Sequence, residues 1–98
     1  MMKAENSCRF TGRLKEFKLY QSQGSDFLFG RGVISLPDEN NCNISQDIKI
    51  TSSGGIAERL SEIPIGTWIM VLTAYMPSKF RGALQDQFHI NALQVKHD

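Results

Sequence analysis

Residues 44–63 read ISQDIKITSSGGIAERLSEI, and this stretch decides the fold. In its first half, isoleucines share one parity and polar residues lie between them, as in a strand with one buried face: Ile44, Ile48 and Ile50. After Gly54 and Gly55, apolar residues follow the spacing of a short amphipathic helix: Ile56, Ala57, Leu60 and Ile63. The stretch therefore predicts a strand over residues 44–51, followed by a helix of about two turns.

Glycine and proline cut the rest of the chain into pieces of strand length. We predict strands over Ser7–Tyr20, Phe27–Leu36, Thr67–Met76 and Gln87–Val95, with a polar loop over residues 77–86. The first strand is long and must bend, so we expect a β-bulge at Gly12. The strand over 67–76 is apolar on both parities, so we expect both of its faces to be buried.

The resulting order, β-β-β-α-β, is that of the five-stranded Greek-key barrel called the OB fold. In this all-β fold the helix lies between the third and fourth strands and closes one end of the barrel, here with Ile56, Leu60 and Ile63. A chain of 98 residues should form a single domain over residues 1–98, because a second core would be too small. The alternative is another small β-barrel, or an α+β roll, with the same strand count.

The composition is that of a soluble globular domain, with 41% hydrophobic and 21% charged residues. The sequence has neither a long apolar run nor an apolar N-terminal stretch, so we expect no membrane association and a cytoplasmic location. Two cysteines, Cys8 and Cys42, are too few for a disulfide framework, and we expect both to be reduced. The net charge of +1 means that any surface for a polyanion must be local.

Residue patterns typical of catalysis or metal binding are not found. His97 lies at the end of the chain, and His89 alternates with Phe88 and Ile90, which makes it a surface residue of a half-buried strand. The cysteines and histidines have neither the spacing of a nucleophile pair nor that of a metal site. We therefore expect no enzyme activity, no metal and no cofactor.

Positive side chains lie beside aromatic rings in three distant segments. The residues concerned are Lys18 and Tyr20, then Phe29 and Arg31, then Lys79, Phe80 and Arg81. Single-stranded nucleic acid needs this combination, because its backbone attracts cations and its exposed bases stack on rings. In an OB barrel the three segments would converge on one face.

Two of these aromatic residues have an alternative assignment. If Leu28, Ile34 and Leu36 point inward, Phe29 and Arg31 point outward, whereas the opposite register would bury Phe29 in the core. Tyr20 fits base binding and ordinary packing equally well.

An apolar stripe on the strand over 67–76 predicts a subunit interface, formed by Trp68, Met70 and Leu72. Bases would need cations nearby, and we expect none beside this stripe. The stripe therefore favours a homodimer or homotetramer over a second stacking surface.

Several short motifs occur in the order known from one protein family: FTGRL at 10–14, IKI at 48–50, GGIAE at 54–58 and IGTWIMV at 65–71. With them, and with a loop and closing strand over Gly82–Val95, the chain resembles the bacterial and phage single-stranded DNA-binding proteins and their relative, primosomal replication protein N. The resemblance covers nearly the whole chain. It implies an OB fold that binds single-stranded DNA without catalysis.

The chain also departs from this family. Where the family has aromatic residues on and just after the third strand, this chain has Asp47 and Ser53. Lys49 matches a basic position, and Phe80 falls in the loop where the family carries an aromatic residue. The acidic tail by which such proteins recruit partners does not follow the barrel, so we do not expect recruitment by that route. The chain resembles a minimal form, like the primosomal relative, or a phage or mobile-element version.

The sequence thus favours a protein of DNA replication, recombination or repair. The predicted DNA-binding residues are Lys18, Tyr20, Phe29, Arg31, Lys49, Lys79, Phe80 and Arg81. Its expected partners are single-stranded DNA, further copies of itself, and replication or primosome proteins. The alternative is an interaction or assembly module of a replication or mobile-element complex with weak or no nucleic-acid binding. That alternative gains if Phe29 is buried and Asp47 lies in the groove without a basic neighbour.

Overall fold

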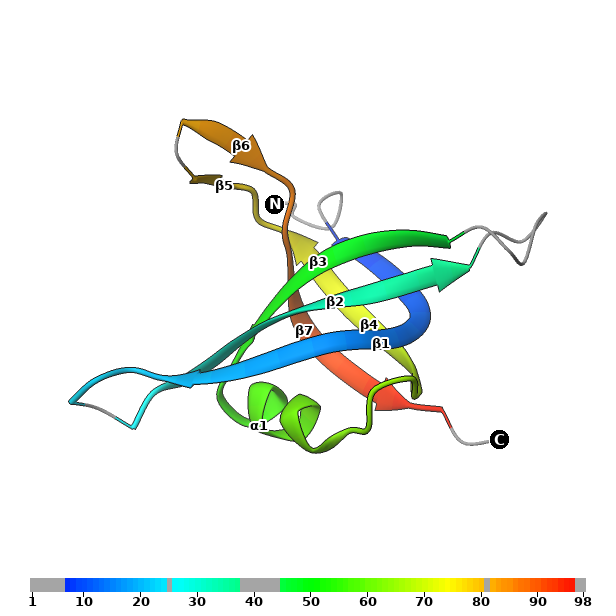
Figure 1. Ribbon diagram of the computed structural model, residues 1–98, viewed down its shortest axis with the longest axis horizontal. Helices are drawn as coiled ribbons and strands as arrows, with labels where there is room; N and C mark the ends of the chain where they lie inside the picture. The colour runs from blue at the N-terminus through cyan, green and yellow to red at the C-terminus, as the bar shows by residue number, and fades with distance from the viewer. Residues whose placement is uncertain (1–6, 25, 38–44, 81, 97–98) are drawn as a thin grey trace.

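Five strands close into a barrel in the order β1-β2-β3-β7-β4 (Figure 1). The computed structural model describes residues 7–24, 26–37, 45–80 and 82–96. The strands and helix are β1 Ser7–Gln21, β2 Leu28–Pro37, β3 Ser45–Ser53, α1 Gly54–Glu62, β4 Trp68–Tyr75, β5 Ser78–Phe80, β6 Ala83–Gln85 and β7 Phe88–Val95. The predicted barrel, with one helix of the described chain between its third and fourth strands, is confirmed.

Strand β1 bends so that it can pair with two neighbours. Residues 7–13 pair with β4, and residues 13–21 pair with β2. The bulge that permits this bend lies between Leu14 and Glu16, so our expectation of a bulge at Gly12 is wrong. Gly12 is needed for a different reason: a Cβ there would lie 2.4 Å from the carbonyl oxygen of Ser35.

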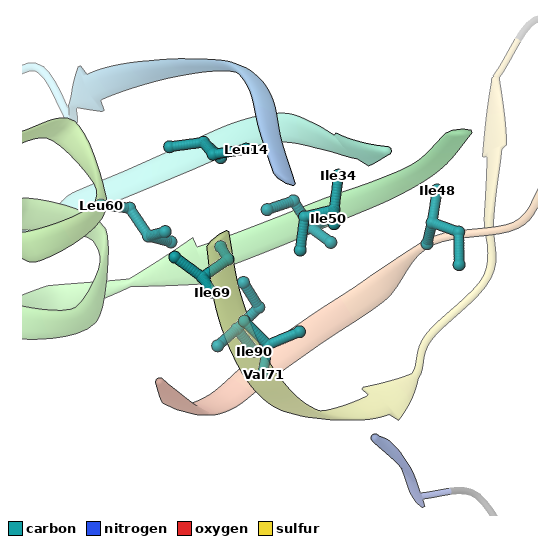
Figure 2. Close-up of a cluster of buried hydrophobic side chains, with 8 residues drawn as sticks. All are labelled: Leu14, Ile34, Ile48, Ile50, Leu60, Ile69, Val71 and Ile90. Atoms are coloured by element: carbon teal, nitrogen blue, oxygen red, sulfur yellow. The ribbon is translucent and has the colours of Figure 1, made fainter. Parts of the chain in front are cut away.

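The core fills the barrel with aliphatic side chains (Figure 2). Its buried members are Leu14, Ile34, Ile48, Ile50, Leu60, Ile69, Val71 and Ile90. Helix α1 lies at the end of the barrel away from the β5–β6 hairpin (Figure 1) and contributes Leu60, which is fully buried. Ile56 of the same helix and Ile63, which directly follows it, pack against this core, as predicted.

The register of β2, which the sequence left open, is resolved by the inner face of the barrel. Ile34 is buried, and Gly30 lies on the same inward parity. A Cβ on Gly30 would lie only 2.1 Å from Cζ of Phe17, so the ring of Phe17 occupies the space that this glycine leaves. Phe29 and Arg31 therefore belong to the outer face of the sheet.

Two further expectations are corrected. The segment over residues 77–86 is not an irregular loop, because it contains the β5–β6 hairpin. The expectation that both faces of β4 are buried is also wrong. Ile69 and Val71 point inward and are fully buried, but Leu72 on the outer face is 45% exposed. One parity of β4 therefore faces away from the core.

Candidate nucleic-acid interface

The outer face of β1, β2 and β3 brings predicted site residues together in cross-strand rows. Tyr20 is the direct partner of Phe29, which in turn pairs with Ser53. Lys18 is the direct partner of Arg31 in the adjacent row. Because direct partners in an antiparallel pair point to the same side, two rings lie next to two cations. The sequence had suggested rings beside cations in separate segments, but it did not show which residues of the different strands lie side by side.

A third row on the same face adds one more predicted cation. Lys49 on β3 pairs with Val33, which pairs with Glu16. The ammonium group of Lys49 donates a hydrogen bond of 3.3 Å to Oε1 of Gln85 on β6. This contact links the barrel face to the strand of the β5–β6 hairpin that returns toward β7.

The aromatic row is longer than the sequence indicated, because Phe27 joins it. The ring centroids of Tyr20 and Phe29 are 5.2 Å apart with planes 15° from parallel. Those of Phe29 and Phe27 are 6.1 Å apart with planes 23° from parallel. Phe27 is 56% exposed and Tyr20 is 37% exposed. The three rings form what we call the aromatic ladder, and alternation with Phe29 was the sequence signal for Phe27.

A groove of about 400 Å³ runs along this face. Its charged lining comes from the rows just described and consists of Glu16, Lys18, Arg31 and Lys49. Tyr20 of the aromatic ladder also lines it, as do Gln85 and Gln87. The groove thus carries three cations against one carboxylate, although the whole chain is nearly neutral.

Asp47 does not bring an unpaired negative charge to this face. Lys15, the residue at the β1 bulge, places its ammonium group 2.6 Å from Oδ2 of Asp47. This hydrogen bond and the attraction of the carboxylate raise the pKa of Lys15 above 10.5. Since Asp47 has a basic neighbour and Phe29 faces outward, both conditions that would have favoured the interaction-module hypothesis fail.

A polar pair that the sequence did not suggest lies beside Arg31. Thr51 is the direct partner of Arg31 across β2 and β3, and of His89 across the parallel pair β3 and β7. The Thr51 hydroxyl and Nδ1 of His89 are 2.9 Å apart and share a hydrogen bond. His89 is half-buried, so it is more than a plain surface residue.

The hairpin contains the remaining predicted site residues. The backbone of Lys79 and Phe80 forms part of β5, opposite Leu84 and Ala83 of β6. The side chains of residues 78–80 and the whole of Arg81 lie outside the part of the chain that the structure describes. The phenol of Tyr75 donates a hydrogen bond to Asp86, which ties the base of the hairpin to β4.

The stripe of Trp68, Met70 and Leu72 lies on the outer face of β4, as predicted, but cations are present beside it. The guanidinium carbon of Arg13 is 5.0 Å from the centre of the Trp68 ring. Arg9 is the direct partner of Leu72. The expectation that no cation lies nearby is therefore wrong. These arginines come from β1, and only the register of β1 with β4 brings them there.

Neither a metal site nor a membrane span is found in the described residues. Groups of three or more histidine, cysteine, aspartate or glutamate residues that could hold a metal ion are not found in the described ranges. None of the helices in the same ranges is both long enough and apolar enough to cross a membrane. Cys8 is a free, half-buried thiol, whereas Cys42 and His97 lie outside the described residues.

No protein-family model matches the chain, and no curated protein matches its sequence. Solved structures do match its fold. A deletion mutant of the single-stranded DNA-binding protein from Thermus aquaticus has a TM-score of 0.79 at 15% identity, over 95% of this chain and 42% of that one. The protein priB from Ralstonia solanacearum has a TM-score of 0.71 at 19% identity, over 93% and 98% of the two chains. The dimeric N-terminal domain of PriB from Thermoanaerobacter tencongensis has a TM-score of 0.73 at 12% identity, over 96% and 99%.

The chain has the OB fold. Its barrel matches nearly the full length of the two PriB structures but only 42% of the Thermus protein. The aromatic ladder and the groove lie on the outer face of the first three strands of this OB barrel. The predicted resemblance is thus confirmed at the level of the fold.

Proposed function

We propose that this OB barrel binds single-stranded DNA without catalysing a reaction, in replication, recombination or repair. The observation that carries the proposal is a row of rings, Tyr20 and Phe29, next to a row of cations, Lys18 and Arg31. A single strand needs cations along its backbone and flat rings for its bases. A further support is the fold, which is shared with the single-stranded DNA-binding protein from Thermus aquaticus.

Each residue of the face has a role in this proposal. Lys18, Arg31 and Lys49 line the groove, where the two lysines neutralise phosphates and Arg31 adds a third positive charge. Tyr20 and Phe29 stack with bases at the edge of the groove. On the hairpin, Lys79 and Arg81 contribute further cations and Phe80 a further ring. The proposal thus keeps all eight predicted residues.

A salt titration of binding to a fluorescent oligo-dT probe tests the proposal. The logarithm of the affinity should fall with the logarithm of salt by about 0.7 for each neutralised phosphate. Lys49→Ala should reduce this slope by about 0.7. Phe29→Ala should weaken binding by about 1–3 kcal/mol, because a stacking platform is lost.

Arg59→Ala is the matched control, because Arg59 lies in the last turn of α1 and is exposed. This variant also removes one positive charge, but its slope and affinity should match those of the wild type. Affinity that does not change with salt would refute the proposal, as would a Lys49→Ala variant indistinguishable from the wild type.

The same proposal includes self-association through the outer face of β4. Trp68, Met70 and Leu72 place apolar surface there, and a stripe of this kind is typical of a subunit interface. Homodimers are the commonest soluble oligomers, and the PriB domain from Thermoanaerobacter tencongensis is dimeric. The partners in the cell would be DNA, further copies of the chain, and replication or primosome proteins.

A further inference from the structure

A second hollow adjoins the groove at the aromatic end of the sheet. It has a volume of about 450 Å³, within the range of small-molecule pockets. It is lined, among others, by Phe27, Phe29, Arg31, Thr51, Ser53 and His89. Arg31 and Thr51 line both this hollow and the groove, so the two share a wall. A strand whose phosphates lie in the groove therefore has a neighbouring pocket for one of its bases.

The walls of this pocket differ in chemistry. Phe27 and Phe29 form an apolar wall of two nearly parallel rings. Rings arranged in this way accept a flat base that continues the stack, and every base can stack. The apolar wall thus supplies affinity without choosing among bases.

The polar wall of the pocket can distinguish one base from another. Arg31 is two residues from Phe29 on the same face of β2, which places its backbone about 7 Å further along the strand. Its guanidinium group is a planar fork of donors and is always charged. Thr51 and His89 are hydrogen-bonded to each other next to it. Arg31 lines the same pocket as the two rings, so the pocket offers a base both a stacking wall and a forked donor.

We propose that this pocket binds a guanine base of the single strand, with O6 and N7 of the base accepting hydrogen bonds from Arg31. Guanine presents two adjacent acceptors on this edge, and a bidentate pair with arginine is the commonest specific contact between proteins and bases. Adenine presents one acceptor and one donor there, and thymine lacks N7. The inference rests on the proposed single-stranded DNA binding and adds a base preference to it.

The test compares probes that differ at one base. The wild-type protein is titrated with fluorescent oligo-dT, with the same probe carrying one central guanine, and with that probe carrying 7-deazaguanine, which lacks N7. The guanine probe should bind about tenfold tighter than oligo-dT, and 7-deazaguanine should lose most of this gain. Because the protein is unchanged, folding does not affect this comparison.

A variant of Arg31 assigns the preference to the pocket. Arg31→Lys keeps the positive charge but loses the planar fork, so this variant should bind the guanine probe no more tightly than oligo-dT. Arg59→Lys on α1 is the control and should keep the gain.

Equal affinity for the guanine and oligo-dT probes would overturn this inference and leave single-stranded DNA binding intact. A preference for guanine that survives both 7-deazaguanine and Arg31→Lys would also overturn it. Failure to bind any of the three probes would instead refute the proposed function.

Discussion

At the residue scale, Tyr75 shows how one polar contact can be followed by titration. Its phenol donates to Asp86, and this hydrogen bond is the main reason that the pKa of Tyr75 lies above 10.0; desolvation and the charge of the carboxylate act in the same direction. The folded-state pKa is raised, so the contribution to stability is complete below pH 10.0 and is lost as the pH rises through the folded value.

We predict that the phenol of Tyr75 ionises above the ordinary range of a tyrosine. In the Tyr20→Phe variant, absorbance of the phenolate reports Tyr75 alone, since the chain has two tyrosines. This signal should appear above pH 10.0, and adding Asp86→Asn should move it to lower pH, because a neutral amide accepts the hydrogen bond more weakly than a carboxylate and carries no negative charge. An ordinary phenol titration in Tyr20→Phe, unaffected by Asp86→Asn, would show that the contact does not form in solution.

At the element scale, the pairing of β1 with β2 depends on a glycine under a ring. Gly30 lies beneath Phe17, and the Cβ of an alanine would lie 2.1 Å from Cζ of that ring. Gly30→Ala should therefore displace Phe17 and lower the free energy of unfolding by about 1–3 kcal/mol. Denaturant unfolding followed by circular dichroism measures the change.

Gly55→Ala in α1 is the matched control for this substitution. A Cβ there meets nothing within 4 Å, and the backbone of Gly55 is not in the left-handed region. This change should raise the free energy of unfolding by about 0.4–1 kcal/mol, because alanine restricts the unfolded chain. Equal effects of the two substitutions would contradict the packing of Phe17 over Gly30.

Local signals in the sequence were sufficient for the main elements. Alternating isoleucines predicted β3, and the apolar stripe with its two leading glycines predicted α1. The bulge was misplaced because a glycine in a strand can mark either a bulge or a close approach, and Gly12 proved to be the second case. The β5–β6 hairpin was missed because its strands are three residues each, too short for a readable alternation.

The site needed information that no single segment carries. Lys18 and Arg31 were candidates from the sequence, but their pairing depends on the bulge that shifts β1 against β2. The hydrogen bond between Thr51 and His89 joins residues 38 positions apart, through a short parallel pairing that closes the barrel. Strand register and barrel closure therefore decide which candidate residues lie together, and neither can be read from the composition of the chain.

At the scale of the whole molecule, the groove and the apolar stripe are on different parts of the barrel wall. The groove follows β1, β2 and β3, whereas the stripe is on β4, which separates β1 from β7 in the closed barrel. Association through β4 would consequently leave the groove open to DNA. The two proposed functions of the surface can thus be tested independently.

Leu72→Glu should separate association from DNA binding. Leu72 is 45% exposed, so a carboxylate there is compatible with the folded barrel but is costly in an apolar interface. In sedimentation velocity the wild type should exceed its chain mass of 11.0 kDa, and the variant should sediment as a monomer. The salt dependence of its binding to oligo-dT should stay close to that of the wild type.

Leu84→Glu provides the comparison, because Leu84 is also exposed, at 64%, but lies on the hairpin rather than on β4. This variant should keep the mass of the wild type. A wild-type chain that stays monomeric at every concentration would remove β4 as an interface. The cation–ring contact of Arg13 with Trp68 would then serve only to cover that ring within one subunit.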